Sequence, residues 1–593
     1  MFSNAFIYLA EKLMYMNQFT RSLFALCVLI SFVGWGQTPL PKGLTQFEKS
    51  NLGRISFTQN KVTDPPTEPV RTMAEWEEVE YLVITWEPSF QNILRQIVTA
   101  AVNECKVIIT TQNESSVANY LSNAGVDMTR VIFMDENWDS IWIRDYAGNT
   151  VYSNDVGTRA LTDWIYNRPR PNDDVIPSAH ASLLDLPIYI TNTGSNDLVN
   201  TGGNFMSDGL GTGFASELIL EENAAGNPYG VSAKTEAEID AIMNAYMGID
   251  RYIKMPALPY DVINHIDMHM KLLDEETLLV SEYPPGVADG PQIEANVAEV
   301  VANYPSVFGT PYNIEWIPAP PSSSGLYPDN GGYYRTYTNA VFINKTVLVP
   351  TYRPQVDGPA LERWQELLPG YNIVGIDVDN SGENLISLLG AIHCITHTIG
   401  VDEPLWIVHQ PIDEAAQGAT VTIDARIEHT SGIQEANVYW REGNEDFVAA
   451  PMTALGNNIW SVDLTLPNTT TLVDYYIDAR ANSGKTLSRP LVAPEGYWTI
   501  NVGNLSLDDF SSHRFISAAV PNPTTGLVRF RLNQIHELVQ VKIHNVLGQE
   551  LYQGTIPVGH GSYELELNAA WQGVLWVQFS GSFGTVYRQV LKL

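Results

Sequence analysis

Short hydrophobic runs and amphipathic stretches follow one another between residues 66 and 402 of the chain. Runs rich in β-branched residues predict buried strands, and these runs are Glu80–Trp86, Val107–Thr110, Val131–Met134, Thr277–Ser281 and Thr346–Tyr352. Apolar residues at helical spacing predict helices, and these are Gln91–Cys105, Ser116–Ala124, Thr235–Met247, Glu294–Tyr304 and Gly358–Leu368. Because strands and helices alternate, we expect an α/β or α+β domain over residues 66–402. It shows neither a clean Rossmann fingerprint nor a Gly-rich phosphate loop.

Helical periodicity stops after residue 402, and alternating polar and apolar positions take its place. The clearest alternations are Val421–Glu428, Ile459–Leu466 and Val473–Ala479. About seven short strands over residues 403–503 predict a β-sandwich of the immunoglobulin type. A polar linker at 504–514 leads to a second all-β unit at 515–593, with strands predicted at Val528–Leu532, Val539–Asn545, Ser562–Leu567, Leu575–Ser580 and Val586–Lys592.

The N-terminal segment has the features of an export signal. A short basic start at Met16–Arg21 precedes the apolar run Leu23–Trp35, which is too short to span a bilayer comfortably. We expect cleavage near Gln37, so residues 1–36 are assigned to a signal peptide, with Met16 as a second plausible start. Residues 37–65 are polar and aperiodic, and we interpret them as a linker or propeptide. No later apolar stretch is long enough for a transmembrane helix.

Charge and composition exclude some classes of protein. The 593-residue chain carries a formal net charge of −34, with 45% hydrophobic and 17% charged residues. This hydrophobic fraction can fill packed cores, which excludes a mostly disordered chain. The negative charge argues against nucleic acid and anionic membranes as partners. It suits a cationic substrate, and it equally suits plain solubility.

Cysteine usage leaves one thiol with possible chemistry. Export would leave Cys105 and Cys394, whereas a secreted fold held by disulfides normally carries more cysteines. Cys105 opens the apolar run at residues 106–110, so we interpret it as a small core residue. Cys394 remains as the thiol that could take part in a reaction.

Two further segments contain candidate catalytic side chains. Asp145 ends an aromatic-rich stretch that begins at Trp138, which can place a carboxylate beside apolar walls, although Arg-Asp pairs such as Arg144-Asp145 are often structural. The segment Asn264–Met270 alternates polar and apolar residues. On a strand, His265, Asp267 and His269 would therefore share one face and could line a pocket. A solvated strand face fits the same pattern.

Cys394 lies in the segment Gly390–His397, between two histidines. In an extended chain His393 would point away from the thiol, which makes it a poor general base. A cysteine near His393 and His397 also suggests zinc, but no second ligand pair at zinc spacing follows. We therefore expect no metal.

Together these segments resemble the guanidine-modifying superfamily, in the branch that holds agmatine deiminase and the secreted bacterial peptidylarginine deiminases. The matching motifs occur in family order, and they are Trp142–Asp145, Gly202–Asn204 with Asp208–Gly209, His265–Asp267 and Gly390–Thr396. The resemblance spans residues 66–402. It implies the pentein fold, a five-bladed pseudo-symmetric α/β propeller with the site on its axis.

The resemblance also implies roles for four residues, with Cys394 as nucleophile, His265 as acid–base, and Asp145 with Asp267 as a guanidinium clamp. These roles suit the chemistry, because the guanidinium of arginine is a planar cation that keeps its proton at ordinary pH. Carboxylates grip such a cation, a thiolate attacks its carbon, and an acid–base group passes a proton to the leaving ammonia. Neither an organic cofactor nor calcium is expected.

Substrate choice is predicted from residues around these motifs. Agmatine deiminases place an acid directly before the Gly-Gly pair, where this chain has Thr201. Arg168 and Arg170 could bind a substrate carboxylate, and by resemblance select C-terminal arginine; a solvated surface turn is the alternative. We expect Trp142 to pack along the aliphatic part of arginine and Asn339 to hold the substrate backbone.

The last unit resembles the C-terminal sorting domain of proteins exported by the type IX secretion system. The matching residues are Pro521–Pro523 with Gly526, Val541–Gln549 and Arg588–Lys592. A generic adhesive β-module is the alternative. The resemblance implies the type IX secretion machinery as a partner, and a secreted or outer-membrane-attached location.

The sequence thus predicts a secreted hydrolase that converts the guanidinium of arginine, peptidyl or free, to citrulline and ammonia through a thiouronium intermediate on Cys394. One alternative is an agmatine deiminase, which would have an acidic substrate rim. The other is a non-catalytic peptide-binding surface protein, in which one of the four catalytic positions would be lost. None is lost.

Overall fold

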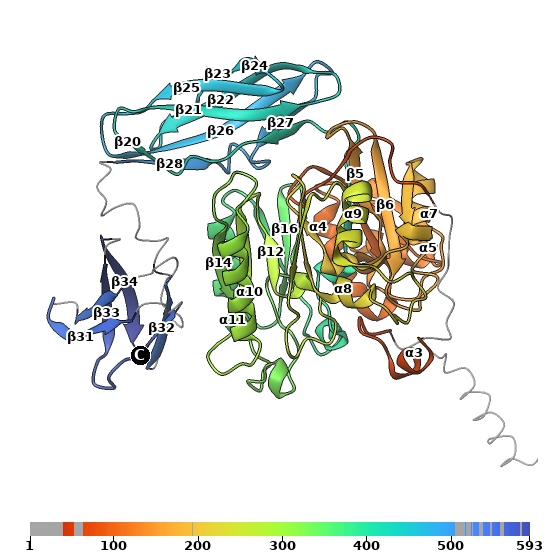
Figure 1. Cartoon of the computed structure of the whole chain (residues 1–593), viewed down its shortest axis with the longest axis horizontal. Coiled ribbons are helices and arrows are strands. Elements are labelled where there is room, and N and C mark those ends of the chain that lie inside the picture. The colour runs from red at the N-terminus through yellow and green to blue at the C-terminus, as the bar shows by residue number, and fades with distance from the viewer. Residues whose placement is uncertain are drawn as a thin grey trace, which may run out of the picture. The chain divides into compact units, whose positions relative to one another are not determined.

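The computed structural model describes residues 39–52, 63–192, 194–503, 516, 524, 526–532, 538–545, 548–557, 562–581 and 584–592. The chain divides into two compact units, Met1–Pro404 and Leu405–Leu593 (Figure 1). The predicted signal peptide at 1–36, the linker at 504–514 and the Pro521–Pro523 motif lie outside the described residues. Within the described ranges, no helix has both the length and the hydropathy needed to cross a membrane.

The described part of the first unit contains five sheets. Two of them are larger, and they comprise β2 (Val79–Thr85), β3 (Lys106–Thr110), β4 (Val131–Met134) and β18 (His397–Gly400), and β1 (Val70–Thr72), β5 (Asn149–Ser153), β6 (Arg159–Tyr166), β7 (Ile188–Thr191) and β8 (Val199–Asn200). Three are three-stranded, and they comprise β9 (Met206–Ser207), β10 (Thr212–Ser216) and β11 (Arg251–Met255); β12 (Met270–Leu272), β13 (Thr277–Glu282) and β14 (Asn313–Pro318); and β15 (Val341–Ile343), β16 (Thr346–Thr351) and β17 (Asn372–Asp377).

One pairing pattern recurs in all five sheets. A central strand pairs antiparallel with one neighbour and parallel with another, and the central strands are β2, β6, β10, β13 and β16. Each parallel pair is joined through helical segments, as such connections require, and these are α4 (Gln91–Ala101), α7 (Ile176–Leu184), α8 (Leu218–Glu222) with α9 (Glu236–Met247), α10 (Gly290–Asn303) and α11 (Pro354–Leu367).

Local sequence explains these helices. In α4 the buried residues Ile93, Leu94, Ile97, Val98 and Ala101 form one apolar face. Helix α9 begins where Thr235 and Glu238 form a capping box, and it ends at Gly248 in the left-handed region. The five strands and five helices predicted for this region are confirmed, with ends shifted by a few residues.

The second unit contains only β structure among its described residues. Strands β19 (Trp406–Val408), β21 (Thr420–Glu428), β25 (Ile459–Thr465) and β24 (Thr453–Gly456) form one sheet. A second sheet comprises β20 (Glu414–Ala416), β28 (Trp498–Gly503), β26 (Thr471–Ala481), β22 (Ile433–Glu442), β23 (Val448–Pro451) and β27 (Thr486–Arg489). Side chains from both sheets, including Ile423 and Ile477, share one core.

The C-terminal part has its own core and two small sheets. They comprise β29 (Leu527–Arg531) with β32 (Ser562–Glu566), and β31 (Glu550–Ile556), β30 (Val539–Asn545), β33 (Gly573–Gly581) and β34 (Gly584–Lys592). The sequence predicted each of these strands except β31. Val541, Val577 and Phe579 are among the fully buried side chains.

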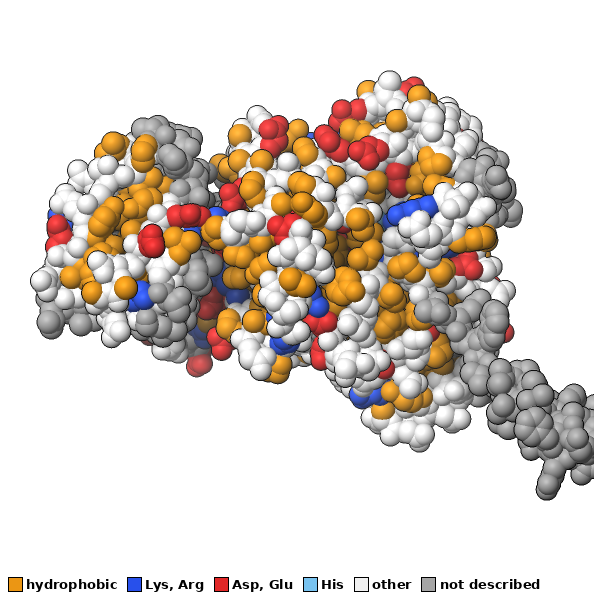
Figure 2. Space-filling view, turned by 90° about the horizontal axis from the view of Figure 1, so that it is seen from below, with side chains coloured by type: hydrophobic (Ala, Val, Ile, Leu, Met, Phe, Trp, Pro, Cys, Tyr) orange, Lys and Arg blue, Asp and Glu red, His pale blue; other side chains and the backbone are white. Residues whose placement is uncertain are grey.

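Charged side chains are dispersed on the surface seen in Figure 2. Acidic and basic groups lie scattered among hydrophobic and uncharged ones, and the blue side chains form only small groups on this face. The pattern agrees with the low basic content of the chain, 33 Lys and Arg against 67 Asp and Glu.

Candidate active site

Cys394 is fully buried in a short 3-10 turn, η9 (His393–Ile395), immediately before β18. Asn339 fixes this turn, because both its main-chain oxygen and its side-chain Oδ1 accept from the amide of His393 at 3.1 Å. Its Nδ2 also donates to the Cys394 Sγ at 3.3 Å. The side-chain amide of Asn339 thus contacts the cysteine turn, and its expected role in holding substrate backbone stays a prediction.

His393 adopts a different position from the one expected. Because η9 is a turn and not extended chain, the His393 ring lies between two carboxylates, with Nδ1 2.8 Å from Asp267 Oδ2 and Nε2 2.7 Å from Glu75 Oε1. Glu75 also pairs with Lys271. The pKa of Glu75 is held well below its usual value because His393 and Lys271 outweigh the effect of burial. This network fixes the orientation of Asp267.

Asp145 lies in α6 (Ile143–Tyr146) and is buried. Neither of its carboxylate oxygens has a hydrogen-bond partner among the described residues. The neighbouring Arg144 points elsewhere, since its Nε donates to the carbonyl of Thr396 at 2.9 Å. A structural pair between Arg144 and Asp145, the alternative left open by the sequence, is thus excluded.

Residues 264–269 do not form the strand on which the sequence pattern would place His265, Asp267 and His269 on one face. Asn264 has a positive φ of 56°, and Ile266–Met268 form a 3-10 turn, η6, so period-two alternation does not apply. His265 and Asp267 still reach one site, with His265 Nδ1 3.5 Å from Asp145 Oδ1. His269 does not, because its Nε2 pairs with Asp261 Oδ2 at 2.9 Å.

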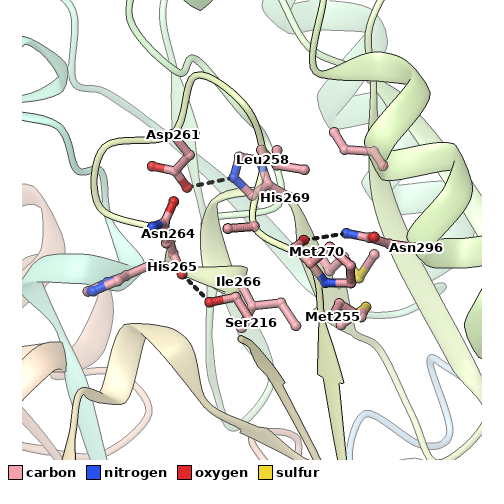
Figure 3. A pocket seen from close by; sticks show the side chains of 13 residues that line it. Ser216, Met255, Leu258, Asp261, Asn264, His265, Ile266, His269, Met270 and Asn296 are labelled. Atoms are coloured by element: carbon pink, nitrogen blue, oxygen red, sulfur yellow. Dashed lines mark hydrogen bonds and ion pairs between the residues drawn. The ribbon is translucent and has the colours of Figure 1, made fainter. Parts of the chain in front are cut away.

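A pocket beside the loop that carries His265, lined by residues other than Cys394, shows how this loop is held (Figure 3). Ser216 Oγ donates to the carbonyl of Asn264 at 2.6 Å, which anchors the loop beside β10. The His265 ring points away from the other lining side chains, among them Leu258 and Met270. The pocket therefore supports the back of the loop, and the thiol is not among its lining residues.

The sequence prediction missed Lys42, whose ammonium lies at the centre of these groups. Lys42 Nζ is 2.8 Å from Cys394 Sγ, 3.5 Å from Asp145 Oδ1 and 3.7 Å from Asp267 Oδ1. The side chain is completely buried. It lies in a polar stretch interpreted as linker or propeptide, and a single lysine between Pro41 and Gly43 carries no periodic signal of burial.

The predicted substrate-binding residues contact the segment that carries Lys42. Arg168 Nε donates to the Lys42 carbonyl at 3.0 Å, and Arg170 Nη2 donates to the Pro41 carbonyl at 2.7 Å. Both arginines are buried, which excludes the solvated turn. Trp142 was expected beside an aliphatic chain, whereas its indole N–H donates to the Leu40 carbonyl at 2.9 Å.

Glycines allow the close approach of these side chains. A Cβ on Gly203 would overlap His265 Nδ1 and would lie 2.8 Å from Asp145 Oδ1 and 3.0 Å from Lys42 Nζ. Gly203 sits in η5 (Gly202–Asn204), one of the motifs that carried the resemblance. Its lack of a side chain leaves the room that the cation occupies.

Burial and the central cation set the protonation of the site. Burial, together with Asp267, raises the pKa of Cys394 to about 12, and Lys42 opposes this shift. Burial raises the pKa of Asp145 to about 6, although Lys42 lowers it. Burial alone would raise the pKa of Asp267, but Lys42 and His393 bring it below its usual value. Burial and Lys42 lower the pKa of His265 well below its usual range, so His265 is neutral.

The arrangement suits a planar cation with several donors. In this site, the buried polar atoms without a hydrogen-bond partner among the described residues include both oxygens of Asp145, Oδ1 of Asp267 and both ring nitrogens of His265. A guanidinium offers five N–H donors in a fixed plane, whereas an ammonium offers three. Among the described residues, no cluster of three or more His, Cys, Asp and Glu side chains is arranged to hold a metal ion.

Comparison with known proteins identifies the family. The sequence model of the Porphyromonas-type peptidyl-arginine deiminases matches residues 71–399, more than half of the chain. The chain belongs to this family. This family consists of hydrolytic deiminases that act on guanidino groups, as the motifs of the chain predicted. A second model, the secretion system C-terminal sorting domain, matches residues 519–592. This confirms the predicted type IX sorting domain and points to a secreted or cell-surface location.

Individual relatives of this deiminase cover most of the first unit. A protein of Yersinia pseudotuberculosis serotype O:1b, named for a proposed agmatine deiminase activity, is 24% identical over 361 residues, covering 55% of this chain and 94% of the relative. Solved structures include a proposed arginine deiminase from Porphyromonas gingivalis (21% identity, TM-score 0.49, 56% of this chain and 98% of that one). Another is the agmatine deiminase of C. jejuni (21% identity, TM-score 0.46, 57% and 99%).

Proposed function

We propose that this deiminase hydrolyses the guanidinium of arginine residues within peptides, yielding citrulline and ammonia. One observation carries the proposal. The cation between Asp145 and Asp267 belongs to Lys42, a residue inside a polypeptide, and Arg168 holds the carbonyl of that same residue. The site therefore has room for a peptide main chain as well as for the cation.

The chemistry assigns one role to each group. The Cys394 thiolate forms a bond to the guanidinium carbon, and the bond from that carbon to a terminal nitrogen breaks as ammonia leaves. His265, which is neutral at rest, accepts the thiol proton of Cys394 and delivers it to the leaving nitrogen, while Asp145 and Asp267 hold the remaining N–H groups. Water then attacks the same carbon and gives a proton to His265. The C–S bond breaks, His265 returns that proton to the sulfur, and the ureido group of citrulline is released while the second proton of the water passes to solvent.

The substrate cation has a second effect on the nucleophile. The pKa of Cys394 is raised by burial and by Asp267, and it is lowered by the adjacent ammonium of Lys42. A bound guanidinium would replace that ammonium and would stabilise the thiolate in the same way. Cationic substrates should therefore be favoured over neutral analogues in the chemical step as well as in binding.

The charge beside the clamp distinguishes a peptide from agmatine. Agmatine carries an ammonium at its far end and no carbonyl, so an acid beside the clamp would favour it. Here Arg168 points its Nε at the Lys42 carbonyl, and Thr201 precedes the Gly-Gly pair. A cationic rim repels an ammonium and supports peptidyl arginine. The retention of Cys394, His265, Asp145 and Asp267 argues against a solely peptide-binding protein.

We also propose that the first unit is a five-bladed α/β propeller. The support is the recurrence of one pairing pattern in five sheets and the pairing of β18 with β2, which brings the end of the unit to its first sheet. The domain boundaries at 402 and 503, the signal peptide and the immunoglobulin type of the sandwich remain proposals of the same kind.

The decisive experiment compares peptide and agmatine in the full-length chain. Purified wild-type and Lys42→Ala proteins are assayed for ureido products with a peptide that contains one internal arginine, with the same peptide ending in arginine, and with agmatine. We expect kcat/KM for both peptides to exceed that for agmatine. A preference for agmatine would reject the proposed substrate class, and the absence of product from all three would reject the reaction.

Arg168 should affect peptides according to the charge of their terminal group. In the Lys42→Ala background, Arg168→Ala removes a charge-assisted bond to a terminal carboxylate, worth ~1.5–3 kcal/mol, so kcat/KM for peptides ending in arginine should fall roughly 10–100-fold. For the same peptide with an amidated C-terminus, the lost hydrogen bond is weaker because the amide carries no charge, so kcat/KM should fall by only several-fold. Agmatine, which lacks this carbonyl, should not become a poorer substrate; equal losses for all three would mean that Arg168 acts on the fold.

Asp145 should give the reaction an acid limb. Its pKa is raised to about 6 by burial and is lowered by Lys42, so in the Lys42→Ala protein it should titrate above that value. A protonated carboxyl is neutral and no longer attracts the substrate cation. The kcat/KM of this variant should therefore decline as pH falls through its Asp145 pKa, and Asp145→Asn should abolish the limb from the residual activity. A flat profile from neutral to mildly acid pH would contradict this assignment.

A further inference from the structure

Residues 39–52 lie in the candidate active site although they precede the part of the chain that matches the deiminase family, which starts at residue 71. The segment ends in α3 (Gln46–Asn51), whose start is stabilised by a capping box between Thr45 and Glu48. Figure 1 shows α3 in red as the first labelled helix of the first unit. The segment is therefore an ordered structure with its own capping signals.

A buried ion pair anchors the segment beyond Lys42. Glu48 Oε1 accepts from Arg170 Nε at 2.9 Å, and both side chains are buried. Burial would raise the pKa of Glu48, but Arg170 and the capping bonds lower it. Arg170 also donates to the carbonyls of Pro41 and Gly43 at 2.7 and 3.2 Å. One arginine thus joins the helix to the residues on either side of Lys42.

The main chain around Lys42 is bound as a peptide would be. The Lys42 amide donates to the Leu388 carbonyl at 2.9 Å, while its own carbonyl accepts from Arg168. On the N-terminal side, the Leu40 carbonyl accepts from the Trp142 indole. These bonds involve backbone groups that every peptide carries, so they define positions for the residues that flank a substrate arginine.

Lys42 is suited to occupy the site without reacting. Its side chain has no carbon bonded to three nitrogens, so the adjacent Cys394 thiol has no electrophile to attack. Its ammonium also fits the clamp loosely, since it lies 3.5 and 3.7 Å from Asp145 and Asp267 and leaves both oxygens of Asp145 without a hydrogen bond. A substrate guanidinium carries the additional donors that these oxygens lack.

We propose that residues 39–52 are an intramolecular inhibitory segment that occupies the peptide subsites of the deiminase, with the Lys42 ammonium in place of the substrate guanidinium. The proposal rests on the proposed function, because it identifies that site as one for arginine within a peptide. It assigns Trp142, Arg170, Leu388 and Arg168 to the main chain around the reacting residue. Full activity then requires displacement or removal of the segment.

The first test compares the activity of full-length variants. Lys42→Ala removes the ammonium that competes intramolecularly with substrate, so kcat/KM for an internal-arginine peptide should rise on the order of 10–100-fold over wild type. Lys49→Ala is the matched control, because Lys49 is exposed on α3 and carries the same charge. It should behave as wild type. Lys42→Met, which keeps most of the side-chain length, serves as a second variant if Lys42→Ala unfolds.

The second test measures access to the thiol without requiring turnover. A cationic haloacetamidine is added in excess, and adducts are located by peptide mass spectrometry. Alkylation of Cys394 should be slow in the wild-type and Lys49→Ala proteins and at least about tenfold faster in Lys42→Ala, where the clamp is open. Arginine peptide should protect the thiol of Lys42→Ala. Equal alkylation rates in all three proteins would overturn the inhibitory role.

The third test turns the inhibitor into a substrate. With Lys42→Arg, the segment presents a guanidinium to Cys394: a C–S bond forms at its carbon, ammonia leaves, and water releases a ureido group at position 42. This conversion should be first order and independent of protein concentration, because the group is delivered within the molecule. Adding Cys394→Ser should stop it. A ureido group at position 42 would show that the segment follows the substrate path.

The outcomes separate the two proposals. If peptides are converted but wild type and Lys42→Ala are equally active and equally alkylated, inhibition is rejected while the proposed function stands. If Lys42→Ala is alkylated faster but converts no substrate, and position 42 of Lys42→Arg stays unmodified, occlusion stands and the proposed function fails. If free peptides are converted while position 42 of a folded Lys42→Arg protein stays unmodified, the subsite assignment is wrong.

Discussion

Citrulline formation by the full-length Lys42→Ala protein should fall by at least about a thousandfold when Cys394 is also replaced with serine. A serine hydroxyl in the same position is a far weaker nucleophile at neutral pH. The buried site adds to the loss, because the surroundings that raise the pKa of the thiol to about 12 would disfavour an alkoxide even more strongly. Ammonia release and ureido product should be measured in parallel.

Cys105→Ser in the same background is the matched control for that result. Cys105 is also buried and free, and burial raises its pKa to about 12, but it lies directly before β3 and is not among the groups that contact Lys42. Its replacement should leave kcat/KM within a few-fold of the parent. Thermal unfolding of both proteins checks the fold. Substantial activity in the Cys394→Ser protein, or a haloacetamidine adduct on Cys105 alone, would remove Cys394 from the mechanism.

Gly203→Ala should lower kcat/KM by on the order of a hundredfold or more, since displacing reacting groups by about 1 Å has an effect of this size. The added methyl group would overlap His265 Nδ1 and would lie 2.8 Å from Asp145 Oδ1. It would also fill space beside the cation, 3.0 Å from Lys42 Nζ. When Gly203→Ala is the only substitution, the same overlap should displace Lys42 from the thiol. Cys394 should then be alkylated faster by a small neutral reagent than in the wild-type protein.

Gly358→Ala provides the comparison for this substitution. Gly358 is exposed in α11, and a Cβ there would meet nothing within 4 Å. Alanine favours helix by about 1 kcal/mol relative to glycine, which opposes the crowding between its Cβ and the following Pro359, so this variant should stay folded and be equally active. Full activity of Gly203→Ala, with an unchanged fold, would show that Asp145 and His265 do not approach the substrate as proposed.

The fold of the first unit could largely be anticipated because its elements depend on local periodicity. The apolar face of α4, the capping residues of α9 and the buried strands β2 and β3 each depend on residues that lie close together in the sequence. Which strands pair is not local information. The pairing of β18 with β2 joins residues more than three hundred positions apart, and only the resemblance to a known family suggested a closed arrangement.

The candidate site was predicted from its motifs, and the errors in that prediction arose where a local sequence pattern was taken to fix the geometry. The alternation around His265 suggested a strand, but the left-handed conformation at Asn264 and the following turn replace it. Lys42 could not be found in this way, because its burial comes from tertiary contacts with Asp145 and Asp267 and from no feature of its own neighbourhood. A lysine in a polar stretch normally indicates exposure.

The position of β18 also affects when the first unit can complete its fold during synthesis and export. The first sheet contains β2, β3 and β4 from the beginning of the unit, yet its other edge is occupied by His397–Gly400, with His397 opposite Val83. A chain emerging from the ribosome, or threading through a membrane, must deliver almost the entire unit before that edge is filled. Contacts of such long sequence separation form slowly. Since Cys394 immediately precedes β18, we expect the thiol to join Asp145 and His265 late in folding, so that a partly exported chain would hold no assembled site.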